Sequence, residues 1–369
     1  MLSGRARRGI RIALTAGVAA IGVLESHPAA HDRTTQVTWT TDVEPILRSR
    51  CVGCHTTGGF APMPLDTYDA ARAAARTIRE AVLERRMPPW PAARGFGDFA
   101  NDRTLTPVEV ELLTAWADGA TPLGPPVAAA VAGGAPRRRP RAPDLMLTVP
   151  PGLEVSGPHR RFEIVTGLTE ERYLAAWAFK PGNRTLVEQA VLSIAPGIRF
   201  GDWTPPEGIV SFPEGVTLRL PPRARIVLDV RYRKSPVPQT DRSAVALYFA
   251  RQPGRPARSR SLGCGTTVID RGIDAFALTP RLASAGESME IVATRPDGSV
   301  DPLCVIPRFE PGYPLTYRFR TSVALPRGTA LSVRSSSPDC AVDLSFVTGR
   351  QPPAGVDRAA AATTGRPRP

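Results

Sequence analysis

The sequence predicts a multidomain protein in which an all-α domain is followed by an all-β module of the jelly-roll or β-sandwich type. Three observations support this fold class. Helix signals, among them a capping box that begins at Thr106, occur within residues 38–122. From residue 145 the pattern changes to short apolar or alternating runs separated by Gly, Pro and Asp, which is typical of β-sandwiches. Residues 123–143, rich in Pro, Ala, Gly and Arg, lack periodicity and are predicted to be a linker.

Residues 1–30 have the composition of a secretory signal peptide. Arginines at positions 5, 7, 8 and 11 precede an apolar run over 12–24, and small residues follow at 28–30. This order predicts a periplasmic or exported protein. The apolar run is short for a membrane span, so an uncleaved anchor is the alternative. It is also the only route to membrane association that the sequence offers.

The net charge of +13 comes almost entirely from arginine, because Lys180 and Lys234 are the only lysines. The chain is also rich in Pro and Ala, so this bias indicates the base composition of a genome rather than a nucleic-acid-binding face. No nucleic-acid partner is therefore expected. A basic surface can still steer an acidic redox partner or an anionic membrane.

Residues 51–55, Cys-Val-Gly-Cys-His, form the pattern by which c-type haem is attached. The spacing lets the thiols of Cys51 and Cys54 form thioethers at one porphyrin edge, and His55 then lies beneath the ring as an axial ligand to iron. A zinc half-site is the alternative, but the other cysteines all follow residue 260. The motif therefore predicts one covalent haem c on Cys51 and Cys54, with His55 as an iron ligand.

Three helices are predicted around this motif. Residues 42–50 form a short helix that leads into it, with Thr41 or Asp42 as the N-cap. Thr67 caps a longer helix over 68–86. The third helix begins at the Thr106 capping box and runs to position 119.

Met87 is predicted to be the sixth ligand of the iron. Residues 87–90, Met-Pro-Pro-Trp, end the second helix, and the prolines hold Met87 in a rigid extended corner. His and Met together are a common ligand pair that raises the reduction potential. Met63, an open site or a second His are the alternatives, and core packing is the alternative role of Met87. Trp90 and Trp116 are predicted to pack in the core or at the haem edge.

The β module is predicted to consist of two sandwiches, residues 144–255 and 256–350, and to end in a disordered tail over 351–369. The expected strands are at 162–165, 216–220, 225–230, 244–249, 289–292, 316–319 and 331–333.

Several stretches carry a resemblance to a known arrangement of domains. They are residues 42–47, 51–55, 61–65, 85–90, 99–103, 116–120, 181–184, 240–243, 247–249, 296–298 and 325–329. In these, the chain resembles a bacterial cytochrome c domain fused to a module similar to the type II, ascorbate-dependent copper monooxygenases. The resemblance implies a cytochrome c domain over 38–122 and a β module that binds two copper ions and hydroxylates a C–H bond.

The resemblance also indicates that the copper ligands have been lost. Where the family carries His-His, His-Tyr-His and Pro-His-Met-His, this chain has Glu188-Gln189, Arg231-Tyr232-Arg233 and Pro280-Arg281-Leu282-Ala283. Copper of this type prefers imidazole nitrogen. The four histidines are His27 and His31 beside the signal, His55 on haem and His159 in a predicted solvated turn. Bound copper is therefore not expected.

The three late cysteines, Cys264, Cys304 and Cys340, allow one disulfide and one free thiol in an oxidising compartment. The sequence leaves the pairing open, and buried small apolar residues are the alternative. The scarcity of histidine also excludes a Ser-His-Asp or Cys-His nucleophile. No catalytic residue is predicted.

The sequence therefore favours an exported monohaem c-type cytochrome that carries one electron to a redox partner protein. The degenerate monooxygenase-like β module would be a docking or structural platform. One alternative is an enzyme, a copper monooxygenase with rebuilt copper ligands that receives electrons from the haem. Another is an anion-binding module in which Arg231, Arg233 and Arg281 converge, against the simpler interpretation of these arginines as an exposed, solvated face.

Overall fold

The helices all lie at the N-terminal end of the described chain. The computed structural model describes residues 37–126, 141–150, 154–155, 157–311 and 313–349. A π-helical turn, Trp39–Val43, leads into α1, Glu44–Arg50, and is followed by α2, Tyr68–Ala73, α3, Ala75–Leu83, and α4, Pro107–Asp118. The predicted signal over 1–30 and tail over 351–369, and most of the predicted linker, lie outside the described residues. None of the described helices is long and apolar enough to cross a bilayer.

Side-chain caps fix where α2 and α4 begin, whereas α1 begins after Val43 without one, so the N-cap predicted at Thr41 or Asp42 is wrong. The capping box predicted at Thr106 is confirmed: its hydroxyl accepts from the Glu109 amide at 3.2 Å, and the Glu109 carboxylate accepts from the Thr106 amide at 2.6 Å. Thr67 caps α2 through the Ala70 amide, as expected. The helix predicted over 68–86 is interrupted at Ala74, whose ψ of 3° departs from helical geometry.

Glu109→Ala is expected to destabilise the protein by about 1 kcal/mol at neutral pH, the usual cost of losing a helix cap. Burial raises the pKa of Glu109, but hydrogen bonds from Thr106 and Arg50 outweigh it and hold this pKa below the ordinary 4.5. A carboxylate with a lowered folded-state pKa stabilises the fold above its unfolded-state pKa, and this contribution is lost as the pH falls through the folded-state pKa.

Urea unfolding of both proteins at pH 7 and at acid pH measures the difference that Glu109 makes. Glu111→Ala, at an exposed position of the same helix, is the matched control and should change little. Equal losses for the two variants at pH 7 would contradict the role given to Glu109.

The helices pack around a small aromatic and aliphatic core. Val43, Leu47 and Leu113 are fully buried in it. The Trp116 ring lies 5.8 Å from the Trp39 ring, and its indole N–H donates to the Pro122 carbonyl at 3.1 Å. The prediction that Trp116 packs in the core is therefore confirmed.

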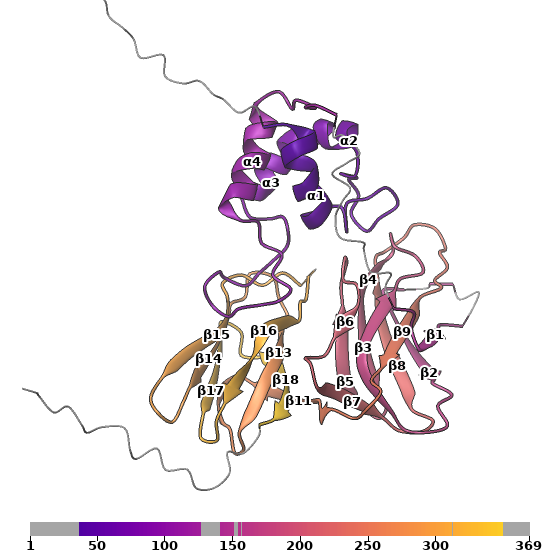
Figure 1. The fold of residues 1–369 in the computed structure, drawn as a ribbon, viewed down its shortest axis with the longest axis vertical. Coiled ribbons are helices and arrows are strands. Elements are labelled where there is room, and N and C mark those ends of the chain that lie inside the picture. Colours follow the sequence, from indigo (N-terminus) through magenta and orange to yellow (C-terminus); the bar gives the residue numbers. More distant parts are fainter. Residues whose placement is uncertain (1–36, 127–140, 151–153, 156, 312, 350–369) are drawn as a thin grey trace, which may run out of the picture. The chain divides into compact units, whose positions relative to one another are not determined.

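Ten strands follow and form two sheets that share one core. They are β1 Leu145–Thr148, β2 His159–Val165, β3 Arg172–Lys180, β4 Val187–Ile194, β5 Ile198–Trp203, β6 Val210–Ser211, β7 Val216–Leu220, β8 Arg225–Tyr232, β9 Ala244–Phe249 and β10 Arg255–Pro256. One sheet has the order β1-β9-β3-β7-β10, with β6 beside β3, and the other has the order β2-β8-β4-β5 (Figure 1). Trp177, Leu228 and Leu247 are buried between them, as in a sandwich.

The last eight strands form a second pair of sheets. They are β11 Arg258–Gly263, β12 Gly265–Val268, β13 Ile273–Arg281, β14 Met289–Thr294, β15 Val300–Ile306, β16 Tyr317–Leu325, β17 Ala330–Ser335 and β18 Ala341–Thr348. The sheet orders are β11-β18-β13-β16 and β12-β17-β14-β15. Leu278, Ile291 and Leu331 lie in the shared core. The expectation of β-sandwiches is confirmed, while the domain boundaries stay a prediction.

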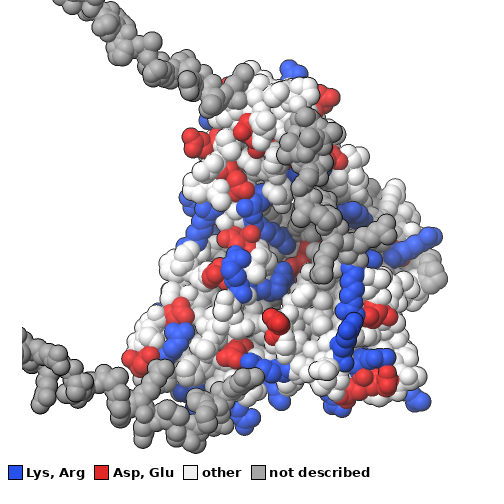
Figure 2. Space-filling model, viewed as in Figure 1, with Lys and Arg blue, Asp and Glu red and all other residues white. Residues whose placement is uncertain are grey.

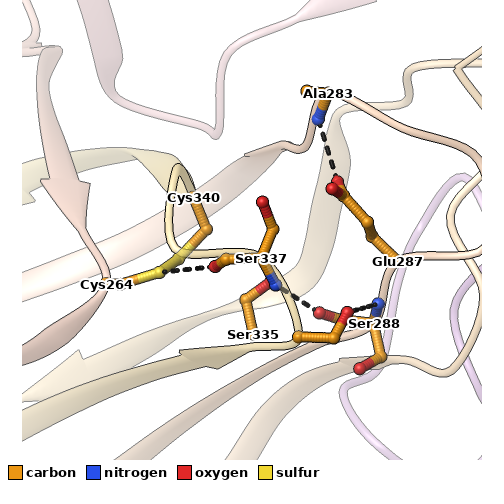
Figure 3. The surroundings of a disulfide bond; sticks show 8 residues. Cys264, Ala283, Glu287, Ser288, Ser335, Ser337 and Cys340 are labelled. Carbon is orange, nitrogen blue, oxygen red and sulfur yellow. Dashed lines mark hydrogen bonds between the residues drawn. A yellow bond between two sulfur atoms is a disulfide. The ribbon is translucent and has the colours of Figure 1, made fainter.

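A disulfide between Cys264 and Cys340 closes this second sandwich (Figure 3). The Cys264 sulfur lies 3.4 Å from the Ser337 carbonyl oxygen, and the Ser337 amide donates to the Ser335 hydroxyl at 3.0 Å. Cys304 is a free thiol that is fully buried in the core. The pairing that the sequence left open is thereby resolved.

The predicted fold class is wrong in its first half. The described residues contain eighteen strands but four short α-helices, so the chain is mainly β. The helices do not form an all-α domain of their own, because they belong to one unit with the sheets from Val37 onward. The loop between α3 and α4 is hydrogen-bonded to strands: the Ala93 amide donates to Val305 and the Ala100 amide to Arg318. Local helix signals gave no sign of these long-range bonds.

Candidate functional site

The predicted haem-attachment motif forms a single turn directly after α1. The Cys51 amide donates to the Leu47 carbonyl at 2.8 Å, and the amides of Cys54 and His55 both donate to the Cys51 carbonyl, at 3.1 and 2.9 Å. Both thiols are free and partly buried. The turn therefore places two thiols one after the other beside the imidazole, as attachment to one porphyrin edge requires.

The imidazole of His55 has one nitrogen engaged and the other available. Its Nδ1 lies 2.8 Å from the Met63 carbonyl oxygen. A carbonyl only accepts hydrogen bonds, so Nδ1 carries the proton and Nε2 keeps its lone pair. The His55 carbonyl in turn accepts from the Leu65 amide at 2.8 Å. The bond at Nδ1 orients the ring as metal-binding histidines are oriented in other proteins, and the bond from Leu65 holds the main chain of His55.

Hydrogen bonds also fold back the loop that follows the motif. The Asp66 carboxylate accepts from the Thr56 hydroxyl at 2.8 Å and from the Thr57 amide at 3.2 Å. These bonds, that from Thr56 first, lower the pKa of Asp66, so the carboxylate stays ionised at neutral pH. The Ala61 amide donates to the Cys54 carbonyl at 3.1 Å. The loop over 56–66 is thus tied to Cys54 and His55 at the end of the motif.

Burial keeps both thiols of the motif protonated. It raises the pKa of Cys51 to about 12, and the nearby Cys54 and Glu109 add to this effect. Burial also raises the pKa of Cys54, although the positive charges of Arg103 and Arg184 oppose it. Both thiols are therefore neutral in the metal-free chain at pH 7.

The motif lies against the first sandwich. A Cβ atom at Gly53 would come within 2.5 Å of the Pro206 side chain, so only glycine fits there. Arg103, from the loop before α4, donates to the Pro205 carbonyl at 3.1 Å. Burial lowers the pKa of Arg103, while the carboxylate of Glu207 opposes this shift. A guanidinium charge is thus held next to the motif.

Arg233, directly after β8 of the first sandwich, reaches the loop over 56–66. Its guanidinium lies 4.5 Å above the Phe60 ring and donates to the Phe60 carbonyl at 3.1 Å, a cation–π geometry. Glu188 lies 3.4 Å from Arg231 and 3.7 Å from Arg233. These three residues therefore form an ion-paired cluster, and Arg233 joins it to the loop.

Arg281 does not join that cluster. Its Nε donates to the Asp343 carboxylate at 2.7 Å, and Arg199 lies 3.4 Å from the same carboxylate. The arginines at 231, 233 and 281 are thus divided between two groups, each with its own carboxylate. They do not show the convergence that the anion-binding alternative requires. On the face shown in Figure 2, basic and acidic side chains lie interspersed.

The two candidate methionines have different contacts. Met63 accepts the hydrogen bond from His55 Nδ1 through its main-chain carbonyl. Met87 follows α3, is partly buried, and its amide donates to the Ala81 carbonyl at 3.2 Å. Met87 as the sixth ligand of the iron stays a prediction, with Met63 as the alternative.

His159 is exposed, as predicted, but it does not lie in a turn. It is the first residue of β2. Within the described ranges, no group of three or more His, Cys, Asp or Glu side chains is placed to hold a metal ion. The sequence did not identify Arg103, Arg233 or Phe60 as parts of the haem site. Their hydrogen bonds join residues more than a hundred positions apart.

Comparison with known proteins gives only weak likenesses for this chain. No family model matches the chain, and no curated protein matches it. Similar solved structures include the major capsid protein P2 of bacteriophage PM2, with 12% identity over 57% of this chain and 99% of that one and a TM-score of 0.30. No family is identified. A putative α-L-fucosidase from Bacteroides ovatus has 12% identity over 64% and 40% of the two chains and a TM-score of 0.19.

An oxalate decarboxylase of Bacillus subtilis is also similar, with 9% identity over 54% of this chain and 72% of that one and a TM-score of 0.15. At such identities and TM-scores these likenesses carry no argument about what the chain does.

The resemblance to a cytochrome c domain fused to a copper monooxygenase-like module is therefore corrected. The structure is mostly β-sheet with four short α-helices, and its described part contains no metal-binding group and no all-α cytochrome c domain. The structure gives no support for haem, iron or a cytochrome c, but it does support a β-sandwich fold. Short matching stretches such as 51–55 and 85–90 specify local turns and not the fold around them. Haem attachment, its ligands and export stay predictions.

Proposed function

We propose that the chain carries one haem, bound covalently through Cys51 and Cys54, and transfers single electrons in an exported compartment. The observation that carries this proposal is the hydrogen bond between His55 Nδ1 and the Met63 carbonyl. It leaves Nε2 available directly after two neutral thiols on one turn. This combination of donors fits a c-type haem better than it fits a bare ion.

The donor set matches what a haem needs from a protein. The porphyrin supplies four nitrogens to the iron, which exchanges one electron, and the protein supplies one or two axial ligands and tunes the potential. A cluster of three protein ligands is therefore not required. His55 would supply one axial nitrogen and Met87 the thioether opposite it, while Cys51 and Cys54 would hold the porphyrin edge.

Positive charges lie beside the haem-attachment motif. Arg103 and Arg184 both act electrostatically on Cys54. Their charges would lie beside the porphyrin edge that Cys54 holds, and a nearby positive charge favours reduced over oxidised iron.

The proposal makes the chain an electron carrier with no catalytic residue. The sandwiches would act as a structural platform and as a docking surface for a redox partner protein. The contacts that support this role are those of Gly53 with Pro206, Arg103 with Pro205 and Arg233 with Phe60. They hold the haem loop on the first sandwich, so a partner that docks there would approach the loop.

The test is the iron and copper content of full-length protein matured in a periplasm that attaches c-type haem. We expect one iron per chain, retained after denaturation and gel electrophoresis, and a visible spectrum that changes reversibly on reduction. Chains without iron, produced in cells that mature a control c-type haem protein, would contradict the proposal. Stoichiometric copper together with C–H hydroxylation would replace it by the monooxygenase alternative.

A further inference from the structure

The loop between α3 and α4, residues 88–104, is built into the second sandwich. The Ala93 amide donates to the Val305 carbonyl of β15 at 2.7 Å. The Ala100 amide donates to the Arg318 carbonyl of β16 at 2.8 Å, and Phe99 pairs with Phe319 in an antiparallel bridge. In Figure 1 the trace of this loop runs down from the helices to β15 and β16. The 88–104 loop thus follows the edges of two strands.

Asn101 completes this pairing with its side chain. Its amide nitrogen donates to the Thr316 carbonyl at 2.8 Å, and its amide oxygen accepts from the Arg318 amide at 3.0 Å. The side chain therefore imitates a neighbouring strand and satisfies two backbone groups at the edge of β16. Loss of this side chain leaves both groups without their partner.

Aromatic packing anchors the start of the loop, close to Met87. The Trp90 ring lies 5.0 Å from the Tyr317 ring and 6.0 Å from the Phe99 ring. Phe99 stacks on Phe319 at 5.4 Å and is buried in the core of the second sandwich. Trp90 is only three residues from Met87, so these contacts limit where Met87 can lie.

The other side of Met87 is held by α3. The amides of Arg86 and Met87 both donate to the Ala81 carbonyl, at 2.9 and 3.2 Å. Met87 therefore lies between two fixed points, the end of α3 and the Trp90 anchor on β16. Two prolines connect the anchor to Met87 and allow little backbone movement.

We infer that the second sandwich positions Met87 as the sixth ligand of the iron, through Asn101 and through the packing of Trp90 on Tyr317. The inference rests on the proposed haem function. Asn101 and Tyr317 are positioning residues, since they act on the iron only through the 88–104 loop. The second sandwich is then a part of the redox centre as well as a platform. A loosened loop would give up the thioether, and with it the higher potential that a Met ligand confers.

The test compares Asn101→Ala and Tyr317→Leu with the wild-type holoprotein. The second variant keeps an apolar side chain and removes the ring on which Trp90 packs. The readouts are the weak long-wavelength absorption band that reports a Met–iron bond in the oxidised protein, and the midpoint potential. We expect full covalent haem in both variants, loss of band intensity and a shift of the potential to lower values.

Two further variants complete the design. Met87→Ala defines complete loss of the band. Tyr248→Leu removes the ring of a buried tyrosine in β9 of the first sandwich and should leave band and potential unchanged. Thermal unfolding of the same samples separates a loss of stability from a loss of Met ligation.

Each outcome decides the inference. An unchanged band and potential in both Asn101→Ala and Tyr317→Leu overturns it, and so does a band that survives Met87→Ala. An equal shift in Tyr248→Leu also overturns it, because the effect would then follow general destabilisation. Wild-type protein without covalent haem on a denaturing gel shows instead that the proposed function has failed.

Discussion

The double variant Cys51→Ser, Cys54→Ser is expected to lose all covalently bound haem. Both thiols are free, partly buried and held on one turn, and no thioether can form without them. The measurement is haem staining after denaturing electrophoresis, together with the mass of the intact chain. A wild-type chain should be heavier by one haem, and the double variant should have the mass of the polypeptide alone.

Cys304→Ala is the matched control for this experiment. Cys304 is the third free cysteine among the described residues, and it lies fully buried in the second sandwich. Its removal should leave the haem content unchanged. Haem that remains covalently bound to the double variant, or that disappears from Cys304→Ala, would show that the motif is not the attachment site.

The double variant Cys264→Ala, Cys340→Ala is expected to be less stable than the wild type by about 4 kcal/mol. The disulfide joins residues separated by 76 positions, and a cross-link over a loop of this length removes much of the conformational entropy of the unfolded chain. Denaturant unfolding under oxidising conditions measures this loss. The wild-type protein should show a similar loss once it is reduced.

The haem content of this disulfide variant should stay at the wild-type level in chains that fold. Cys264 and Cys340 bond to each other, and Cys264 contacts Ser337. The haem-attachment turn and the loop after it are held by hydrogen bonds among residues 47–66. An unfolding free energy equal to that of the wild type would show that the bond does not form in solution.

Local features of the chain were readable from the sequence. The Thr106 capping box and the strands at 216–220 and 244–249 coincide with α4, β7 and β9. Each depends on residues within a few positions of one another, which is the range over which caps and alternation act. The break at Ala74 was not readable, because alanine favours helix and nothing in the nearby sequence signals an interruption.

The fold class was mispredicted because its decisive contacts are long-range. Residues 88–104 lie between two predicted helices, yet Phe99 lies in the core of the second sandwich. No local pattern predicts that Asn101 bonds to Thr316 and Arg318. The all-α domain expected from the helix signals therefore does not exist as a separate body.

The candidate site was predicted in part. Cys51, Cys54 and His55 follow from their spacing, and their turn depends on adjacent residues. No periodic sequence pattern signals the hydrogen bond of His55 to Met63, which lies eight positions away. The contact of Arg233 with Phe60 joins residues 173 positions apart. Opposite charges at Glu188 and Arg231 could have suggested an ion pair, had the pairing of β4 with β8 been known.

The 88–104 loop is synthesised long before β16, the strand beside which it lies. Asn101 and Thr316, which directly precedes that strand, are 215 positions apart. Contacts of this range form late and slow folding. A chain interrupted before β16 leaves Trp90 and Phe99 without the rings on which they pack. The N-terminal helices therefore complete their surroundings only when nearly the whole polypeptide has been released.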